Sequence, residues 1–274
     1  MHGWPAPLDV TKRANISRRE WGGSLADGDM IHELDVEHWA FWSPESRDPA
    51  AWRRHWTSPT AEPSAAEVPD EAIPAAHRRR MSSLTRLAVQ IAIEAAGDCR
   101  PDFLIFCSQH GDLTRLREML NDISSRAELS PTTFSQSVHN ASAGLFTIIS
   151  GSTAPVSALA AGRGTFAAGW LEAEGFLVAH PEARVLLVTY DEPLPPEYAS
   201  YTSQAPCAYG VGVLLRRAAE RPGVVLRPAA VKEDDSLPLA PLFLAWLLSS
   251  DALLHASADG QGWMWTRAPR APSS

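Results

Sequence analysis

Three side chains in the first half of this sequence could together perform nucleophilic chemistry. Cys107 ends the apolar run of residues 103–107, His110 follows it across a short turn, and His139 stands further along the chain. A cysteine thiolate with an imidazole as its base attacks acyl carbonyls, so Cys107 with His110 or His139 predicts an acyl transferase or thioesterase. The alternative is structural, because buried thiols are common and a histidine among small residues often only satisfies its hydrogen bonds.

The other possible ligand-binding signatures are weak. His32 and His38 alternate with acidic residues, which places them on both faces of a strand and predicts no metal cluster. No glycine-rich phosphate loop follows a predicted strand, since Gly210 and Gly212 lie inside a strand pattern. The arginines at 78–80 fit a solvated or interface-facing helix start better than a phosphate site. We therefore expect neither a metal nor a cofactor.

Composition narrows the function classes further. The net charge of −8 over 274 residues argues against a nucleic-acid partner and against an anionic membrane surface. Three cysteines without paired spacing predict neither a disulfide framework nor a zinc site, so a reducing cytoplasm is the expected location. The longest apolar piece, residues 239–248, contains Pro241 and is too short to span a membrane.

Alternating strand and helix patterns must position these residues. The predicted elements are a helix from Ser82, a buried strand at 103–107, an apolar-faced helix from 113, a helix at 137–150, a short strand at 154–159, a small-residue helix at 162–179, strands at 185–190, 208–215 and 224–231, and an apolar helix at 237–250. This order predicts an α/β fold, a mostly parallel sheet with helices on both faces.

The same patterns predict the domain organisation. Residues 31–265 are expected to form a single domain, which includes a β-compatible stretch at its start and a short helix carrying Trp52 and Trp56. Residues 1–30 are polar, rich in proline, glycine and charge, and lack periodicity, so we expect a flexible arm there. Residues 266–274 are expected to be a tail.

The turn that leads into the small-residue helix is the usual place for a nucleophile in an α/β protein of this pattern. It reads SALAAG over residues 157–162, and after Ser157 it offers no cysteine, serine, histidine or acid. The sequence is therefore poor in conventional catalytic signatures, which favours a non-catalytic role.

The order of these segments resembles the N-terminal half of the thiolase-like β-ketoacyl synthases. The family's helix start is similar to RRMSSLTRLA at 79–88, and its "SPF…NMxAG" segment is similar to SPTTF at 130–134 with SVHNASAG at 137–144. Its nucleophile corner resembles SALAAG, and its "GEGAGVLVLE" strand resembles YGVGVLL at 209–215. The resemblance covers roughly residues 73–217 and implies a truncated thiolase-like domain.

Two departures from the family pattern bear on function. Leu159 stands where the family has its nucleophilic cysteine, and leucine has no lone pair with which to attack a thioester. The chain also ends soon after the strand at 224, which leaves no room for the half that carries the family's two histidines. Both departures are similar to the shortened chain-length-factor-like proteins of aryl polyene and xanthomonadin-type pigment clusters.

That resemblance implies a pseudoenzyme, not an enzyme on its own. Such a subunit pairs with a full-length β-ketoacyl synthase as a heterodimer, closes its acyl or polyene tunnel, and touches the acyl carrier protein only indirectly, in type II polyketide or fatty-acid-type biosynthesis. The alternatives that stay open are a stand-alone acyl transferase or thioesterase using Cys107, and a homodimeric scaffold without a tunnel.

The resemblance also implies roles for particular residues. The positions that match the tunnel-gating helix and the turn beyond it are Leu113, Leu116, Met119, Leu120 and Phe134. Their alternative is the ordinary core of an amphipathic helix. A half-length chain would leave the small-residue helices exposed, so the expected partner interface contains Ser137, His139, Asn140, Ala143, Gly144, Phe166 and Trp170.

Overall fold

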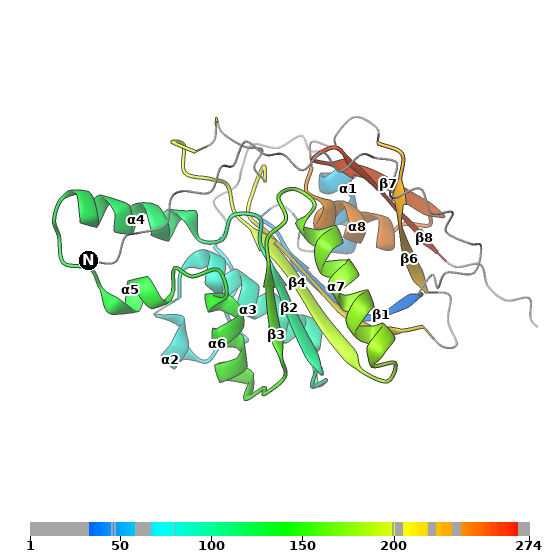
Figure 1. The fold of residues 1–274 in the computed structure, drawn as a ribbon, viewed down its shortest axis with the longest axis horizontal. Coiled ribbons are helices and arrows are strands. Elements are labelled where there is room, and N and C mark those ends of the chain that lie inside the picture. The colour runs from blue at the N-terminus through cyan, green and yellow to red at the C-terminus, as the bar shows by residue number, and fades with distance from the viewer. Residues whose placement is uncertain are drawn as a thin grey trace, which may run out of the picture. The chain divides into compact units, whose positions relative to one another are not determined.

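The computed structural model describes residues 33–44, 46, 48–57, 67–79, 81–198, 200, 205–218, 223–231 and 237–267 (Figure 1). The strands found there are β1 (Leu34–Trp42), β2 (Phe103–Cys107), β3 (Val156–Leu159), β4 (Arg184–Asp191), β5 (Tyr209–Arg217), β6 (Val224–Ala229), β7 (Leu253–Ala258) and β8 (Gln261–Arg267). The helices are α1 (Pro49–Thr57), α2 (Ala75–Arg78), α3 (Ser83–Ala96), α4 (Leu113–Ser124), α5 (Pro131–Ser135), α6 (Ala141–Ser150), α7 (Thr165–Ala179) and α8 (Leu239–Leu247). The predicted arm, residues 1–30, lies outside the described residues.

All these strands belong to one sheet, in the order β3-β2-β4-β5-β1-β6-β8-β7. The α/β class is confirmed, but the prediction of a mostly parallel sheet is wrong. Only the pairs β2–β3 and β2–β4 are parallel, and the remaining strand pairs in the described part of the chain are antiparallel. Two residues predicted as tail, Thr266 and Arg267, belong to β8.

The connections explain this mixture. Parallel strands need a crossover, usually a helix, and α7 supplies one between β3 and β4, which lie on either side of β2. The link from β4 to β5 has no helix in its described residues, so β5 runs back along β4. β7 and β8 are joined by the two-residue turn Asp259–Gly260, where both residues have positive φ as such hairpin turns require.

Helix α3 and helix α6 pack on one face of the sheet. Ser82 caps α3 by accepting a hydrogen bond from the Thr85 amide, and Gly97 ends the helix at φ 53°. The helix approaches β5 closely, because a Cβ at Gly212 would lie 2.7 Å from the Ala95 Cβ. The prediction that Gly210 and Gly212 lie within a strand is confirmed. Their lack of a side chain allows α3 to pack closely on that strand.

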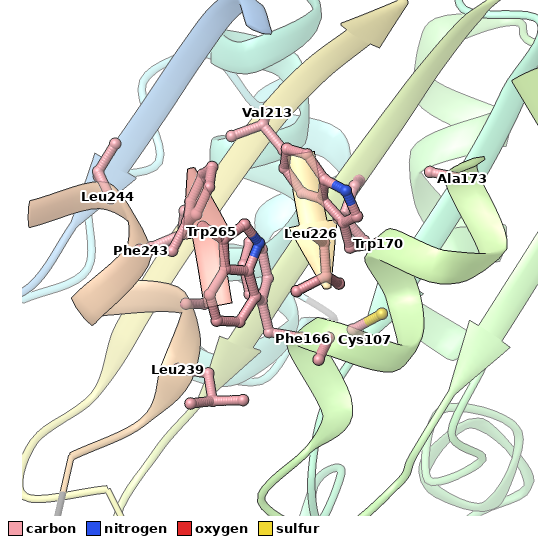
Figure 2. Packing of buried hydrophobic residues seen from close by; sticks show 14 of the residues in the cluster. Cys107, Phe166, Trp170, Ala173, Val213, Leu226, Leu239, Phe243, Leu244 and Trp265 are labelled. Atoms are coloured by element: carbon pink, nitrogen blue, oxygen red, sulfur yellow. The ribbon is translucent and has the colours of Figure 1, made fainter. Parts of the chain in front are cut away.

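Helices α1, α7 and α8 pack on the opposite face, where the larger core lies (Figure 2). Phe166 and Trp170 of α7 are 2 % and 0 % exposed, and their rings lie 5.0 and 5.1 Å from the ring of Phe243 in α8. Trp265 of β8 packs 6.0 Å from Phe166. The expectation that Phe166 and Trp170 form a partner interface is therefore wrong, because α8 and the β7–β8 hairpin cover them within the same chain.

Candidate functional site

The corner between β3 and α7 is closed by its own backbone and by the β7–β8 hairpin. β3 ends at Leu159, which pairs with Cys107 of β2, and Gly162 turns the chain at φ 56°. The Asp259 carboxylate accepts a hydrogen bond from the Arg163 amide at 2.8 Å. It also lies where a Cβ on Gly162 would stand, so the hairpin tip sits directly on the turn.

The space behind this corner is too small for a substrate. A cavity of about 20 Å³ is lined by residues that include His110, Gly162, Phe166, Asp191 and Leu239. A cavity of this size holds about one water molecule.

A buried carboxylate organises the turn after β2. Asp191, at the end of β4, accepts hydrogen bonds from the Ser108 hydroxyl at 2.7 Å, the Gln109 amide at 2.9 Å and the Tyr209 hydroxyl at 3.1 Å. Burial raises the pKa of Asp191, and these donors act in the opposite direction. The arrangement holds the β2 turn against β4 and β5, a role that sequence reasoning missed because the partners of Asp191 come from two segments that are distant in the sequence.

Cys107 is poorly suited to act as a nucleophile. The side chain is fully buried under α7, and a Cβ on Gly169 would lie 2.6 Å from its sulfur. Burial raises the pKa of the Cys107 thiol far above its ordinary value, and the charge of Asp191 raises it further. Since the thiolate is the reactive form, these observations argue against the stand-alone enzyme that uses Cys107.

The two histidines proposed as its base lie in structural surroundings. The Nε2 atom of His139 is 2.9 Å from the carbonyl oxygen of Ser108, so this ring joins the start of α6 to the turn after β2. The Nε2 atom of His110 is buried and has no hydrogen-bond partner among the described residues. No contact between either ring and the Cys107 sulfur is present in the described part of the chain.

The five residues predicted to line a tunnel divide into two groups. Met119 is buried and Leu113 is half-buried. Leu116, Leu120 and Phe134 are 38 %, 47 % and 60 % exposed. The exposed group lies on α4 and α5, which project beside α6 (Figure 1).

The predicted interface residues of the α6 region also divide. Ala143 is fully buried against the α3 side of the sheet, while Ser137 and His139 are half-buried. Asn140 and Gly144 are exposed. A Cβ on Gly144 would meet nothing within 4 Å, so no element of the described chain covers this face of α6.

Strand β3 offers a feature that sequence reasoning missed. It stands at one end of the sheet and pairs only with β2 in the described part of the chain. Its side chains alternate between exposed and half-buried, and Val156 is 41 % exposed. The sequence pattern predicted this short strand, but nothing in the pattern indicates that the strand lies at the edge of the sheet.

A cysteine–histidine contact also escaped the sequence. The sulfur of Cys207 lies 3.8 Å from Nε2 of His55, although 152 positions separate the two residues. No spacing rule connects a helix near the start of the fold with the segment before β5. Only the folded chain places this thiol beside an imidazole.

Comparison with known proteins identifies the family. The sequence matches the β-ketoacyl synthase N-terminal domain over residues 50–266, and the chain therefore belongs to that family. The predicted resemblance to the N-terminal half of the thiolase-like β-ketoacyl synthases is confirmed. No curated protein matches the sequence.

Solved structures place the fold among ketosynthase assemblies. A chain in the structure of the ketosynthase ApeO with its chain length factor ApeC from Xenorhabdus doucetiae is similar, with a TM-score of 0.74 and 26 % identity over 86 % of this chain and 99 % of that one. The ishigamide ketosynthase/chain length factor gives a TM-score of 0.63 and 13 % identity, over 87 % of this chain and 100 % of that one. AntDE:AntF, a type II acyl-carrier protein with its ketosynthase, gives a TM-score of 0.62 and 11 % identity, over 87 % of this chain and 99 % of that one. The latter two share the fold.

Membrane-spanning helices and metal-binding clusters are both absent from the described residues. None of their helices has the length and apolar character to cross a bilayer. The same residues contain no group of three or more histidine, cysteine or acidic side chains that could hold a metal ion.

Proposed function

We propose that this chain is a chain-length-factor subunit without a condensing site of its own, which pairs with a full-length β-ketoacyl synthase in the cytoplasm. The observation that carries the proposal is the distribution of exposed apolar side chains. Among the described residues, eleven large apolar side chains are exposed, and eight of them lie between 116 and 156: Leu116, Leu120, Ile123, Leu129, Phe134, Val138, Ile148 and Val156. Such a concentration on one segment marks a protein–protein interface.

The open edge of the sheet also supports the proposed interface. β3 has unpaired backbone donors and acceptors on its outer side in the described part of the chain, and an open edge can add a strand from a partner. Ile148 on the neighbouring α6 is 67 % exposed. Backbone pairing at β3, flanked by apolar contacts from α6, would give the heterodimer both affinity and register.

The helices α4 and α5 form an arm that is fixed at its base. Thr114 donates a hydrogen bond to Glu192 at 3.1 Å, and Arg115 donates to Gln136 at 2.6 Å across the two ends of the arm. These polar contacts hold the arm while its apolar side chains stay exposed. We propose that Leu116, Leu120 and Phe134 close the partner's acyl or polyene tunnel, and that Met119 and Leu113 support them from within.

The closed corner supports a non-catalytic role. Leu159 has no nucleophilic atom, and the space behind the corner holds about one water molecule. Condensation would therefore belong to the partner, and acyl carrier protein would be touched only indirectly. Similarity to chains of ketosynthase/chain length factor structures supports this assignment, and an aryl polyene or xanthomonadin-type pathway is our proposal for its setting.

Co-expression with full-length ketosynthases of the same organism tests the proposal. We expect one of them to co-purify as a stable complex, and native mass spectrometry to give a heterodimer or a higher assembly that contains both chains. A monodisperse protein that never associates with a ketosynthase would overturn the proposal. A homodimer as the only assembly would favour the scaffold without a tunnel.

A further inference from the structure

The contact between Cys207 and His55 has the geometry of a nucleophile with its base. The sulfur-to-Nε2 distance of 3.8 Å is within reach of a weak hydrogen bond to sulfur. His55 lies in the last turn of α1. Its ring also stands perpendicular to that of Trp56 at 4.9 Å, which restricts its orientation.

A pocket adjoins the thiol. It has a volume of about 200 Å³, and its wall includes Cys207, Trp42, Leu84, Leu87 and Glu192. The wall is mainly apolar, with one carboxylate. Pockets for drug-sized ligands measure roughly 300–1,000 Å³, so this one suits a smaller apolar group.

The other two cysteines lack an imidazole neighbour in the described part of the chain. Cys207 is buried, at 3 % exposed, as is Cys107, whereas Cys99 is half-buried. Burial raises the thiol pKa of Cys107 and of Cys99. Cys207 differs from both in having an imidazole nitrogen beside its sulfur and in lining a pocket.

We propose that Cys207 and His55 form a nucleophilic pair that accepts a short acyl group from a thioester. Nε2 of His55 takes the thiol proton as the sulfur attacks the thioester carbonyl. A bond forms between the carbonyl carbon and the Cys207 sulfur, the bond from that carbon to the original thioester sulfur breaks, and the leaving thiolate takes the proton from the imidazolium. The products are an acyl thioester on Cys207 and one free small thiol, with no oxidant or reductant consumed. This site lies apart from the β3–α7 corner and needs no partner subunit.

Labelling of the full chain with S-butyryl-N-acetylcysteamine tests the pair. We expect intact-mass analysis to show one added butyryl group, and peptide mapping to place it on Cys207. Cys207→Ser should abolish the label, whereas Cys107→Ser and Cys99→Ser should retain it. His55→Gln should slow labelling by about a hundredfold, as for loss of a general base.

The controls separate chemistry from folding. Circular dichroism and thermal unfolding of His55→Gln should match the original chain, and iodoacetamide should still alkylate Cys99 in every variant that retains it. A dodecanoyl thioester should react more slowly than the butyryl one, because the pocket is small. Labelling of Cys99 in preference to Cys207, no labelling at all, or an unchanged rate in a folded His55→Gln protein would each overturn the proposal.

Discussion

The β3–α7 corner and the α4–α5 arm both carry large apolar side chains, and these side chains have opposite exposures in the two regions. In α7, Phe166 and Trp170 are at most 2 % exposed, because α8 and the β7–β8 hairpin cover them. In the arm, Leu120 and Phe134 are 47 % and 60 % exposed, and no described element covers them. The difference separates a region that the chain covers by itself from a region that it leaves exposed, which is where we propose that the partner docks.

The largest effect should come from opening the covered region. Trp170→Ala removes a fully buried ring that packs on Phe243, and we expect a loss of about 3–5 kcal/mol in the free energy of unfolding. Leu171→Ala, the next position on the same helix, is the matched control. Its side chain is 44 % exposed, so its loss should stay within about 0.5 kcal/mol. Urea unfolding followed by circular dichroism measures both, and equal losses would contradict the coverage described for α7.

Charged substitutions on the exposed α4–α5 arm should weaken association with the ketosynthase and leave the stability of the chain nearly unchanged. Leu120→Asp and Phe134→Asp should each weaken ketosynthase binding by about 2 kcal/mol or more, roughly thirtyfold, with little change in thermal unfolding. Leu253→Asp is the control, since Leu253 is 53 % exposed on β7 at the opposite end of the sheet. Titration calorimetry or native mass spectrometry gives the affinities. A loss from Leu253→Asp equal to that from the arm variants would show that the arm is not the docking face.

The joint between arm and body should respond to pH. Burial, and secondarily the charge of Asp112, raise the pKa of Glu192 from 4.5 to about 6, so the folded chain holds a proton that the unfolded chain has released. Its contribution to stability is full below pH 4.5 and is lost as pH rises through 6, by up to about 2 kcal/mol. Glu192→Gln keeps an oxygen for Thr114 and should remove this part of the slope. Urea unfolding of both proteins at pH 4.5 and 7 measures it, and identical slopes would refute the assignment.

Restoring a thiol at the β3–α7 corner should not create condensing activity. Leu159→Cys restores a thiol at the end of β3, but the cavity behind it still holds about one water, so we expect no condensing activity from the isolated variant. Carbon–carbon bond formation from acyl and malonyl thioesters, followed by mass spectrometry, is the assay. Measurable condensation by this variant would mean that the corner admits substrate.

Local patterns were enough to predict most elements. The apolar runs at 103–107 and 185–190 are strands, and the stripe that begins at Leu84 is a helix, because burial of such runs depends little on distant context. The segment 137–150 shows the limit of this reasoning. Its helix begins only at Ala141, and a short helix that no pattern predicted, α5, precedes it with Ser130 as its cap and Pro131 as its first residue.

The sequence alone determined the residue at position 159 and the family. Leu159 is leucine whatever the fold, and the order of the motifs along the chain can be read without the structure. The direction of the strands, the cover over α7 and the open edge of β3 were decided only by tertiary structure. Each depends on which distant segments meet, as Asp259 meets Arg163 and Cys207 meets His55. Periodicity reports how a segment buries its own face, and it carries no information about the identity of the segment that covers that face.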